Sequence, residues 1–170
     1  MKQPYRPFID SLTAAEDDAK SVDTTDMEWP EHPAPLPGAP VVAILSPHPD
    51  DECIVGGLAL RLARQSGMRV VNVAVTLGSK PARAPARWEE LKRACRYAGF
   101  EVVLPREGGY ENITVAGRRD DPDHWKAARD GIAELLGTLR PAVVMAPHAE
   151  DWHPTHVGTH ELAADALHEL

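Results

Sequence analysis

The fold is decided by the stretch VVAILS at 41–46, which is followed at once by PHPDDE at 47–52. The first six residues are almost all apolar and include three β-branched valine and isoleucine side chains, which is typical of a strand buried on both faces of a sheet. The next six place a histidine and three carboxylates where that strand must end. This pattern predicts a buried parallel strand with polar, reactive side chains at its carboxyl end.

A helix that pairs with this first strand, and then three further strand and helix pairs, follow along the chain. Apolar runs predict strands over 70–75, 101–105 and 142–147, and apolar residues at helical spacing predict helices over 52–65, 85–98, 122–139 and 154–170. Repeated strand–helix units indicate an α/β, Rossmann-like three-layer fold with a mostly parallel sheet. Right-handed crossovers favour strand order 3-2-1-4. The first and fourth strands are then neighbours, and a ligand crevice is expected at their carboxyl ends.

The first forty residues have a different composition. They contain eight acidic side chains, three basic ones and seven prolines. Proline fixes φ and removes a backbone donor, which disfavours regular structure. We interpret 1–40 as an acidic, proline-rich N-terminal arm or linker, and 41–170 as the folded domain.

Charge and hydropathy exclude several partners. The net charge of −8 argues against nucleic acid and against an anionic membrane surface. The longest apolar run is five residues, far short of the ~20 that span a bilayer, and no signal-peptide pattern precedes it. We therefore expect a soluble, cytoplasmic protein with no membrane insertion. Cys53 and Cys95 are too few for a disulfide framework and are interpreted as reduced thiols.

A second polar stretch, PHAEDWHPTH at 147–156, follows the fourth predicted strand. Because the first and fourth strands are predicted neighbours, the loops that follow them should meet. Imidazole and carboxylate side chains together suit Zn²⁺, or another divalent metal such as Fe²⁺, Mn²⁺ or Co²⁺.

A catalytic metal needs about three protein ligands and an open position for water. His48, Asp51 and His156 supply such a set. Asp50 is then left free to take a proton as general base. Two alternatives stay open: Asp50 or Asp51 caps the following helix, or His160, one helical turn after His156, is the ligand instead.

These residues resemble the PIG-L/LmbE-like metal-dependent de-N-acetylases. The match rests on PHPDDE (47–52), HPTH (153–156) and RWEEL (87–91), and it covers about 41–165. The resemblance implies a Rossmann-like catalytic domain, zinc, and removal of an acetyl group from a small-molecule amino sugar of the N-acetylglucosamine type. By position the resemblance implies that His48, Asp51 and His156 are metal ligands and that Asp50 is the general base. It implies that His153 stabilises the oxyanion and protonates the leaving amine. It also implies that Arg87 contacts the substrate.

The chain departs from the family pattern in two ways. Thr155 stands where the family usually has an aspartate that supports His153. We hypothesise that Asp151 substitutes for it. The chain also ends at Leu170, earlier than family members usually do, so two alternatives stay open: a fragment, or a homo-oligomer in which a partner subunit completes the pocket.

Two other functions remain as alternatives. One is an amidase acting on a non-sugar conjugate, such as a thiol conjugate or an antibiotic intermediate. The other is a non-catalytic binding domain with the same fold. A dinucleotide-binding enzyme is disfavoured, because the turn at 47–52 lacks the GxGxxG pattern and its carboxylates would repel phosphate.

Overall fold

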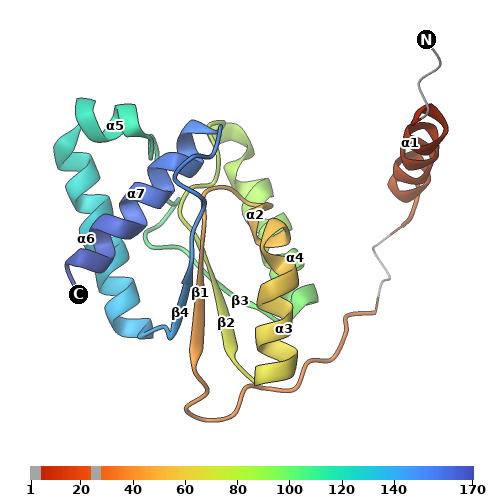
Figure 1. Cartoon of the computed structure of the whole chain (residues 1–170), viewed down its shortest axis with the longest axis horizontal. Coiled ribbons are helices and arrows are strands. Elements are labelled where there is room, and N and C mark those ends of the chain that lie inside the picture. The colour runs from red at the N-terminus through yellow and green to blue at the C-terminus, as the bar shows by residue number, and fades with distance from the viewer. Residues whose placement is uncertain (1–4, 24–27) are drawn as a thin grey trace. The chain divides into compact units, whose positions relative to one another are not determined.

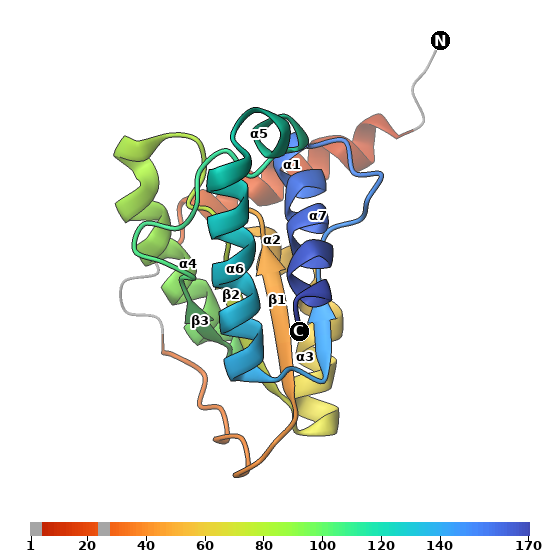
Figure 2. The same ribbon diagram turned by 90° about the vertical axis from the view of Figure 1, so that its left-hand side faces the viewer.

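The structure, a computed structural model, describes residues 5–23 and 28–170 of the chain. It divides the chain into two compact units, 1–30 and 31–170. The second unit has the predicted α/β fold, with a parallel sheet of strand order β3-β2-β1-β4 between two layers of helices (Figures 1 and 2). The strands are β1 (Val41–Ser46), β2 (Arg69–Ala74), β3 (Glu101–Val103) and β4 (Val143–Met145).

Strand β1 lies in the middle of the sheet, and all six of its residues are buried. At its centre, Ile44 lies between Asn72 of β2 and Met145 of β4. A strand paired on both sides and covered on both faces can carry an uninterrupted apolar run, which explains VVAILS. Because β1 and β4 are parallel neighbours, their carboxyl ends lie side by side.

Each face of the sheet is covered by a separate apolar layer. Leu136 and Leu162 belong to one layer, and Leu91 and Cys95 to the other. The first layer is formed with α6 (Pro122–Leu139) and α7 (Pro154–His168), beside the short α5 (Val115–Asp120). The second is formed with α3 (Gly56–Ser66) and α4 (Ala84–Ala98), which follow α2 (Asp51–Ile54) and the 3₁₀ turn η1 (Pro81–Arg83), respectively.

Two helical features differ from the sequence prediction. The single helix predicted over 52–65 is broken at Val55 into α2 and α3. The glycine pair at 56–57 follows the break directly, and such pairs are a common cause of helix interruption. The helix α5 lies between the strand predicted over 101–105 and the helix predicted over 122–139, where the sequence predicted no helix or strand. Its start is capped by Thr114, whose hydroxyl accepts the Gly117 N–H at 2.9 Å.

The segment 1–40 contains a helix that was not predicted, α1 (Arg6–Lys20). None of its residues is buried, so it has no apolar stripe packed on a core to reveal it. Ion pairs at helical spacing, such as Arg6–Asp10, support it locally. Residues 1–4 and 24–27 lie outside the described residues. Residues 31–40 belong to the second unit, where His32 hydrogen-bonds the Tyr97 carbonyl oxygen at 2.9 Å. The role of 1–40 as an arm stays a prediction.

Both cysteines are free thiols. Burial raises the pKa of the Cys95 thiol to about 12. Partial burial, and then the neighbouring Glu52 carboxylate, raise the pKa of Cys53. Because the thiolate is the reactive form, neither side chain is prepared to act as a nucleophile. No helix among the described residues is long and apolar enough to cross a bilayer.

Candidate metal centre

The loop that follows β1 is held by side chains from two other parts of the fold. The Thr76 hydroxyl, just after β2, donates to the Pro47 carbonyl oxygen at 2.7 Å. The Arg87 guanidinium, on α4, donates through Nη2 to the Pro49 carbonyl oxygen at 2.7 Å. These bonds pair carbonyl groups that no strand partner would satisfy. The loop is therefore fixed by the tertiary structure around it.

Asp50 lies at the sharpest point of this loop, with φ of 139°. Residues with a side chain rarely adopt such a conformation, and it persists only where neighbouring contacts enforce it. One such contact is Glu52, whose Oε2 accepts the Asp50 N–H at 2.9 Å and whose side chain is buried. Glu52 could not be recognised from the sequence, because a glutamate in the first turn of a helix is ordinary.

The loop that follows β4 is held mainly by its own side chains. Asp151 Oδ1 accepts the His153 N–H at 2.9 Å, and His148 Nδ1 accepts the Glu150 N–H at 3.1 Å. His153 is the N-cap of α7, and its Nδ1 accepts the Thr155 N–H at 3.3 Å. A side chain that accepts a backbone N–H at a helix start satisfies one of the donors left unpaired there. This loop therefore folds through short-range hydrogen bonds.

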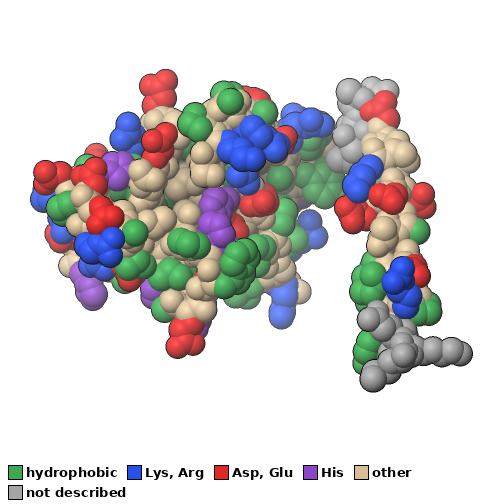
Figure 3. All heavy atoms as spheres, turned by 90° about the horizontal axis from the view of Figure 1, so that it is seen from above, with side chains coloured by type: hydrophobic (Ala, Val, Ile, Leu, Met, Phe, Trp, Pro, Cys, Tyr) green, Lys and Arg blue, Asp and Glu red, His purple; other side chains and the backbone are tan. Residues whose placement is uncertain are grey.

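The two loops meet at the carboxyl ends of β1 and β4. Asp51 lies between two imidazoles: its Oδ2 is 3.4 Å from His48 Nδ1, and its Oδ1 is 3.4 Å from His156 Nε2. Nitrogens of His48, His153 and His156 also lie within 4.8 Å of one another. Seen from above, histidine side chains gather at the centre of this face, next to acidic and basic side chains (Figure 3).

This donor set fits a divalent metal ion. Ligands bound tetrahedrally at ~2.1 Å are separated from each other by roughly 3.4 Å, and the two Asp51 contacts match that separation. His156 Nδ1 is 3.1 Å from Asp151 Oδ2, so the carboxylate can accept a hydrogen bond from Nδ1–H, which leaves the Nε2 lone pair on the side of Asp51. A carboxylate behind a ligating histidine is a usual support for such a ligand.

His153 is the rival to Asp51 for the third ligand position, because it belongs to the same histidine group. Its Nδ1 accepts the Thr155 N–H, so the neutral ring carries its proton on Nε2. Burial, and then the nearby His48 and His156 rings, lower the pKa of His153 and favour this neutral form. A protonated Nε2 donates a hydrogen bond and does not bind a metal, which favours Asp51 as the ligand.

The other histidines of the second loop lie outside this group. His160 Nδ1 hydrogen-bonds the Pro147 carbonyl oxygen at 2.8 Å, which gives the ring a structural partner. His148 is exposed and accepts the Glu150 N–H. Neither belongs to the His48, His153 and His156 group or is among the histidines in ion-pair contact with Asp51, so the geometry favours His156 over His160 as the ligand.

Asp50 and Asp151 lie differently from what the sequence suggested. The Asp50 carboxylate is not among the histidines: it is exposed, and its Oδ2 is 3.4 Å from Arg87 Nη2. Asp151 contacts the ring of His156 and only the backbone of His153. The geometry thus supports Asp151 as a partner of the proposed ligand, and not as a direct replacement for the family aspartate at 155.

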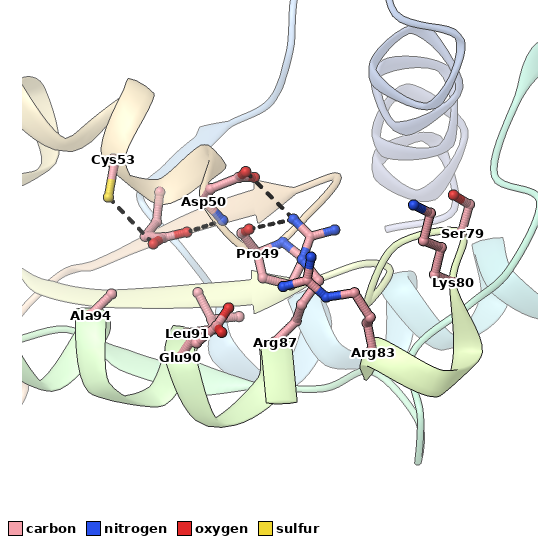
Figure 4. Close-up of a pocket in the computed structure, with 11 residues that line it drawn as sticks. Pro49, Asp50, Cys53, Ser79, Lys80, Arg83, Arg87, Glu90, Leu91 and Ala94 are labelled. Carbon is pink, nitrogen blue, oxygen red and sulfur yellow. Dashed lines mark hydrogen bonds and ion pairs between the residues drawn. The ribbon is translucent and has the colours of Figure 1, made fainter. Parts of the chain in front are cut away.

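Two cavities flank this centre. The histidine cavity, of about 470 Å³, is lined by His48, His153 and Thr155 together with Thr76 and Tyr110. The arginine cavity, of about 580 Å³, is lined by charged side chains that include Asp50, Lys80, Arg83 and Arg87 (Figure 4). Ser79 and Arg87 line both cavities. Gly78 allows this, because its φ is +88° and a Cβ there would collide with the Arg87 guanidinium.

Comparison with known families agrees with this geometry. The model of the PIG-L family, GlcNAc-PI de-N-acetylase, matches residues 43–167, which include both loops. The chain belongs to the PIG-L family. The match begins at the third residue of β1 and ends in α7, so it includes part of β1 and all of β2, β3 and β4.

Relatives and solved structures extend the comparison. A 1D-myo-inositol 2-acetamido-2-deoxy-alpha-D-glucopyranoside deacetylase of Corynebacterium efficiens is 31% identical over 158 residues, covering 77% of this chain and 50% of its own length. The conserved protein TT1542 of Thermus thermophilus is 28% identical with a TM-score of 0.57, covering 76% of this chain and 56% of its own.

An N,N'-diacetylchitobiose deacetylase of Pyrococcus horikoshii has a TM-score of 0.58 at 21% identity, covering 95% of this chain and 58% of its own. At that identity the likeness establishes the fold alone. This PIG-L family chain spans about half the length of the curated relatives that it matches.

Proposed function

We propose that this PIG-L family chain is a metal-dependent hydrolase that removes an acetyl group from the amide nitrogen of an N-acetylglucosamine-type substrate, with zinc as the metal. The observation that carries the proposal is the position of Asp51, 3.4 Å from a ring nitrogen of both His48 and His156. Of these three donors, His48 also lines the histidine cavity, which is the side on which a catalytic metal would keep its open position for water.

His48, Asp51 and His156 would hold the metal, and Asp151 would orient His156. When bound, the metal supplies a lowered water pKa and polarisation of the substrate carbonyl. Cavity walls formed by Thr76 and Tyr110 would position the acetyl-bearing nitrogen next to these residues.

Two side chains of the chain handle the protons and charge of the reaction. Asp50 takes the proton of the attacking water, for which its carboxylate must turn away from Arg87; catalytic contacts often form only in the substrate complex. His153, protonated on Nε2, donates to the oxygen of the former carbonyl as negative charge develops there. One such donor contributes about 3–4 kcal/mol. Protonated Asp50 then returns its proton to the leaving amine.

The substrate class is inferred from the curated relatives. Those of Nocardia farcinica and Corynebacterium efficiens are deacetylases of an inositol-linked acetamido sugar. We extend the acetylated amino sugar, but not the inositol, to this chain. Arg87, which lines both cavities, is proposed to contact the sugar through its fixed fork of donors.

The test combines metal content with amine release. Purified protein should contain zinc or another divalent metal by elemental analysis and release amine from acetylated amino sugars. His156→Ala should lose the metal, whereas His160→Ala, the matched histidine one turn later, should keep it. Metal retained by His156→Ala would refute the ligand set. Metal-loaded protein that releases no amine from any acetylated amino sugar would refute the activity.

A further inference from the structure

Trp152 is the most exposed of the large hydrophobic side chains that the structure describes, at 89%. It lies in the loop after β4, between Asp151, which contacts the proposed ligand His156, and His153, which lines the histidine cavity. The centroids of the Trp152 and His153 rings are 5.4 Å apart, and the ring planes are perpendicular, at 85°. A large apolar surface therefore stands in solvent beside the candidate metal centre, on the face where Figure 3 shows hydrophobic side chains next to the histidines.

The folding of the loop does not account for a tryptophan at this position. The side chains that hold the loop by hydrogen bonds are those of His148, Asp151 and His153. The Trp152 indole N–H donates to none of the residues that the structure describes, and the ring belongs to neither apolar layer of the sheet. Tryptophan is enriched where proteins bind other molecules, because its rigid ring offers a large apolar area. The exposed ring thus indicates a binding role.

The backbone on both sides of Trp152 is held in place. The Asp151 N–H donates to the His148 carbonyl oxygen at 3.2 Å, and the His153 N–H donates to Asp151 Oδ1 at 2.9 Å. His153 is also the N-cap of α7, so the helix begins directly after the tryptophan. When a ligand binds against the indole, mainly the rotation of this one side chain has to be restricted, which keeps the entropic cost of binding small.

The neighbouring cavity indicates what the ring contacts. His153 lines the histidine cavity, next to which the acetamido group of the substrate is proposed to react, whereas Trp152 is not part of the cavity lining. A substrate group that leaves this cavity past His153 would meet the indole. The indole is uncharged, and the exposed carboxylate of Glu150 in the same loop disfavours an anionic group here. The surroundings therefore favour a neutral group with an apolar face.

We propose that Trp152 is a specificity-determining residue whose indole packs against an uncharged ring that the substrate carries beyond its acetamido sugar. A flat indole suits the C–H face of a saturated ring, because the contact buries apolar area and places C–H groups against the negative face of the π system. A second sugar and an apolar aglycone both present such a face. The inference rests on the proposed deacetylation and adds to it a preference for substrates larger than one sugar.

The kinetic test compares three neutral substrates that differ only in the group on the anomeric oxygen of N-acetylglucosamine: methyl, cyclohexyl and glucosyl. Metal-loaded wild-type protein should have a higher kcat/KM for one or both ring-bearing substrates than for the methyl one, by roughly two- to tenfold and mainly through KM. The cyclohexyl and glucosyl arms distinguish an apolar aglycone from a second sugar. Trp152→Ala should bring the ratio of kcat/KM values close to one. Trp152→Phe should keep part of the preference, because phenylalanine retains an aromatic face.

Tyr97→Ala is the matched control, because Tyr97 is another exposed aromatic side chain and lines neither cavity. It should keep the wild-type ratio. Equal kcat/KM for all three substrates in the wild-type protein would overturn the inference while leaving the deacetylase proposal intact. A Trp152→Ala protein that loses activity by the same factor on every substrate would also overturn it, since the tryptophan would then only shape the loop.

Tryptophan emission tests the contact without turnover, in the Asp50→Asn background where deacetylation is expected to be slow. An indole in solvent emits at long wavelength, and covering it should shift the emission to shorter wavelength. Titration with the preferred ring-bearing substrate should produce this shift, and the methyl substrate should produce a smaller one. Adding Trp152→Phe should abolish the shift, whereas adding Tyr97→Ala should not. This result supports the contact even if deacetylation fails, and no shift, or an unchanged shift with Trp152→Phe, refutes it.

A second copy of the chain is the competing partner for the exposed ring. Light scattering should give the same molar mass for the wild-type and Trp152→Ala proteins. A wild-type oligomer that dissociates in Trp152→Ala would assign the ring to an interface between copies and overturn the inference. Thermal unfolding of each variant verifies that it is folded.

Discussion

The two loops that form the candidate metal centre are held in contrasting ways. The loop after β1 is largely buried, with Asp51 and Glu52 only 8% and 4% exposed, and it is bonded to side chains from other elements. The loop after β4 is open, with Trp152 89% exposed, and it is held mostly by its own side chains. The first half of the site therefore depends on the core, and the second on a few local hydrogen bonds.

The largest effect is expected at the apex of the β1 loop. Asp50→Asn should lower kcat by about 10²–10⁴-fold, because the amide cannot take a proton from water. Asparagine tolerates positive φ better than most residues, so the loop should keep its shape. Elemental analysis should find the metal content unchanged. Loss of the metal in this variant would instead indicate that Asp50 is a metal ligand, as is proposed for Asp51.

A smaller effect is expected in the β4 loop. Asp151→Ala should weaken metal binding by about 10–100-fold, because His156 loses the carboxylate that orients its ring. Competition with a chelator would measure this. Glu150→Ala is the control, since Glu150 is exposed and only its backbone N–H bonds within the loop. Equal affinities in the wild-type and Asp151→Ala proteins would show that the loop does not rely on this local contact.

Glu52 tests whether the β1 loop depends on buried contacts. Glu52→Ala leaves the Asp50 N–H without its acceptor, and we expect the free energy of unfolding to fall by about 1–3 kcal/mol. Glu52→Gln should recover part of the loss, because its carbonyl oxygen can accept the same bond. Chemical denaturation provides the values. If the alanine and glutamine variants were equally stable, the hydrogen bond to Asp50 would not be what holds the loop.

The smallest effect is expected at the opposite end of the sheet, where Arg69 of β2 pairs with Glu101 of β3. The hydrogen bond from Arg69 lowers the pKa of Glu101 below its ordinary value of 4.5, although burial opposes this. A lowered folded pKa means that the pair stabilises the protein above pH 4.5 and loses this effect as pH falls through the folded pKa.

Glu101→Gln should therefore cost at most about 1 kcal/mol near neutral pH, since both side chains are over a third exposed. The difference in stability from wild type should vanish in acid, and the proposed deacetylase activity should not change. Thermal unfolding at several pH values measures the difference in stability, and amine release measures the activity. A large change in activity would mean that the amino ends of the strands influence the candidate site at their carboxyl ends.

Much of the fold follows from local sequence patterns. The apolar run at 41–46 and the glycine that ends α4 are visible without a structure, and the strand order follows from the handedness of crossovers. The interruption at Val55 and the helix α5 could not be predicted in this way, because each is too short to show a period. The helix α1 was not predicted for another reason: none of its residues is buried, so it has no apolar stripe packed on a core to indicate it.

The sequence by itself determined which residue types meet: two loops with histidine and carboxylate, placed by topology at adjacent strand ends. It did not determine which way each side chain faces. Only the tertiary structure paired Asp151 with His156, turned Asp50 toward Arg87, and placed Lys80 and Arg83 around a second cavity. The physical reason is that pairing along strands follows a simple period, whereas side-chain partners in loops depend on contacts between residues far apart in the chain.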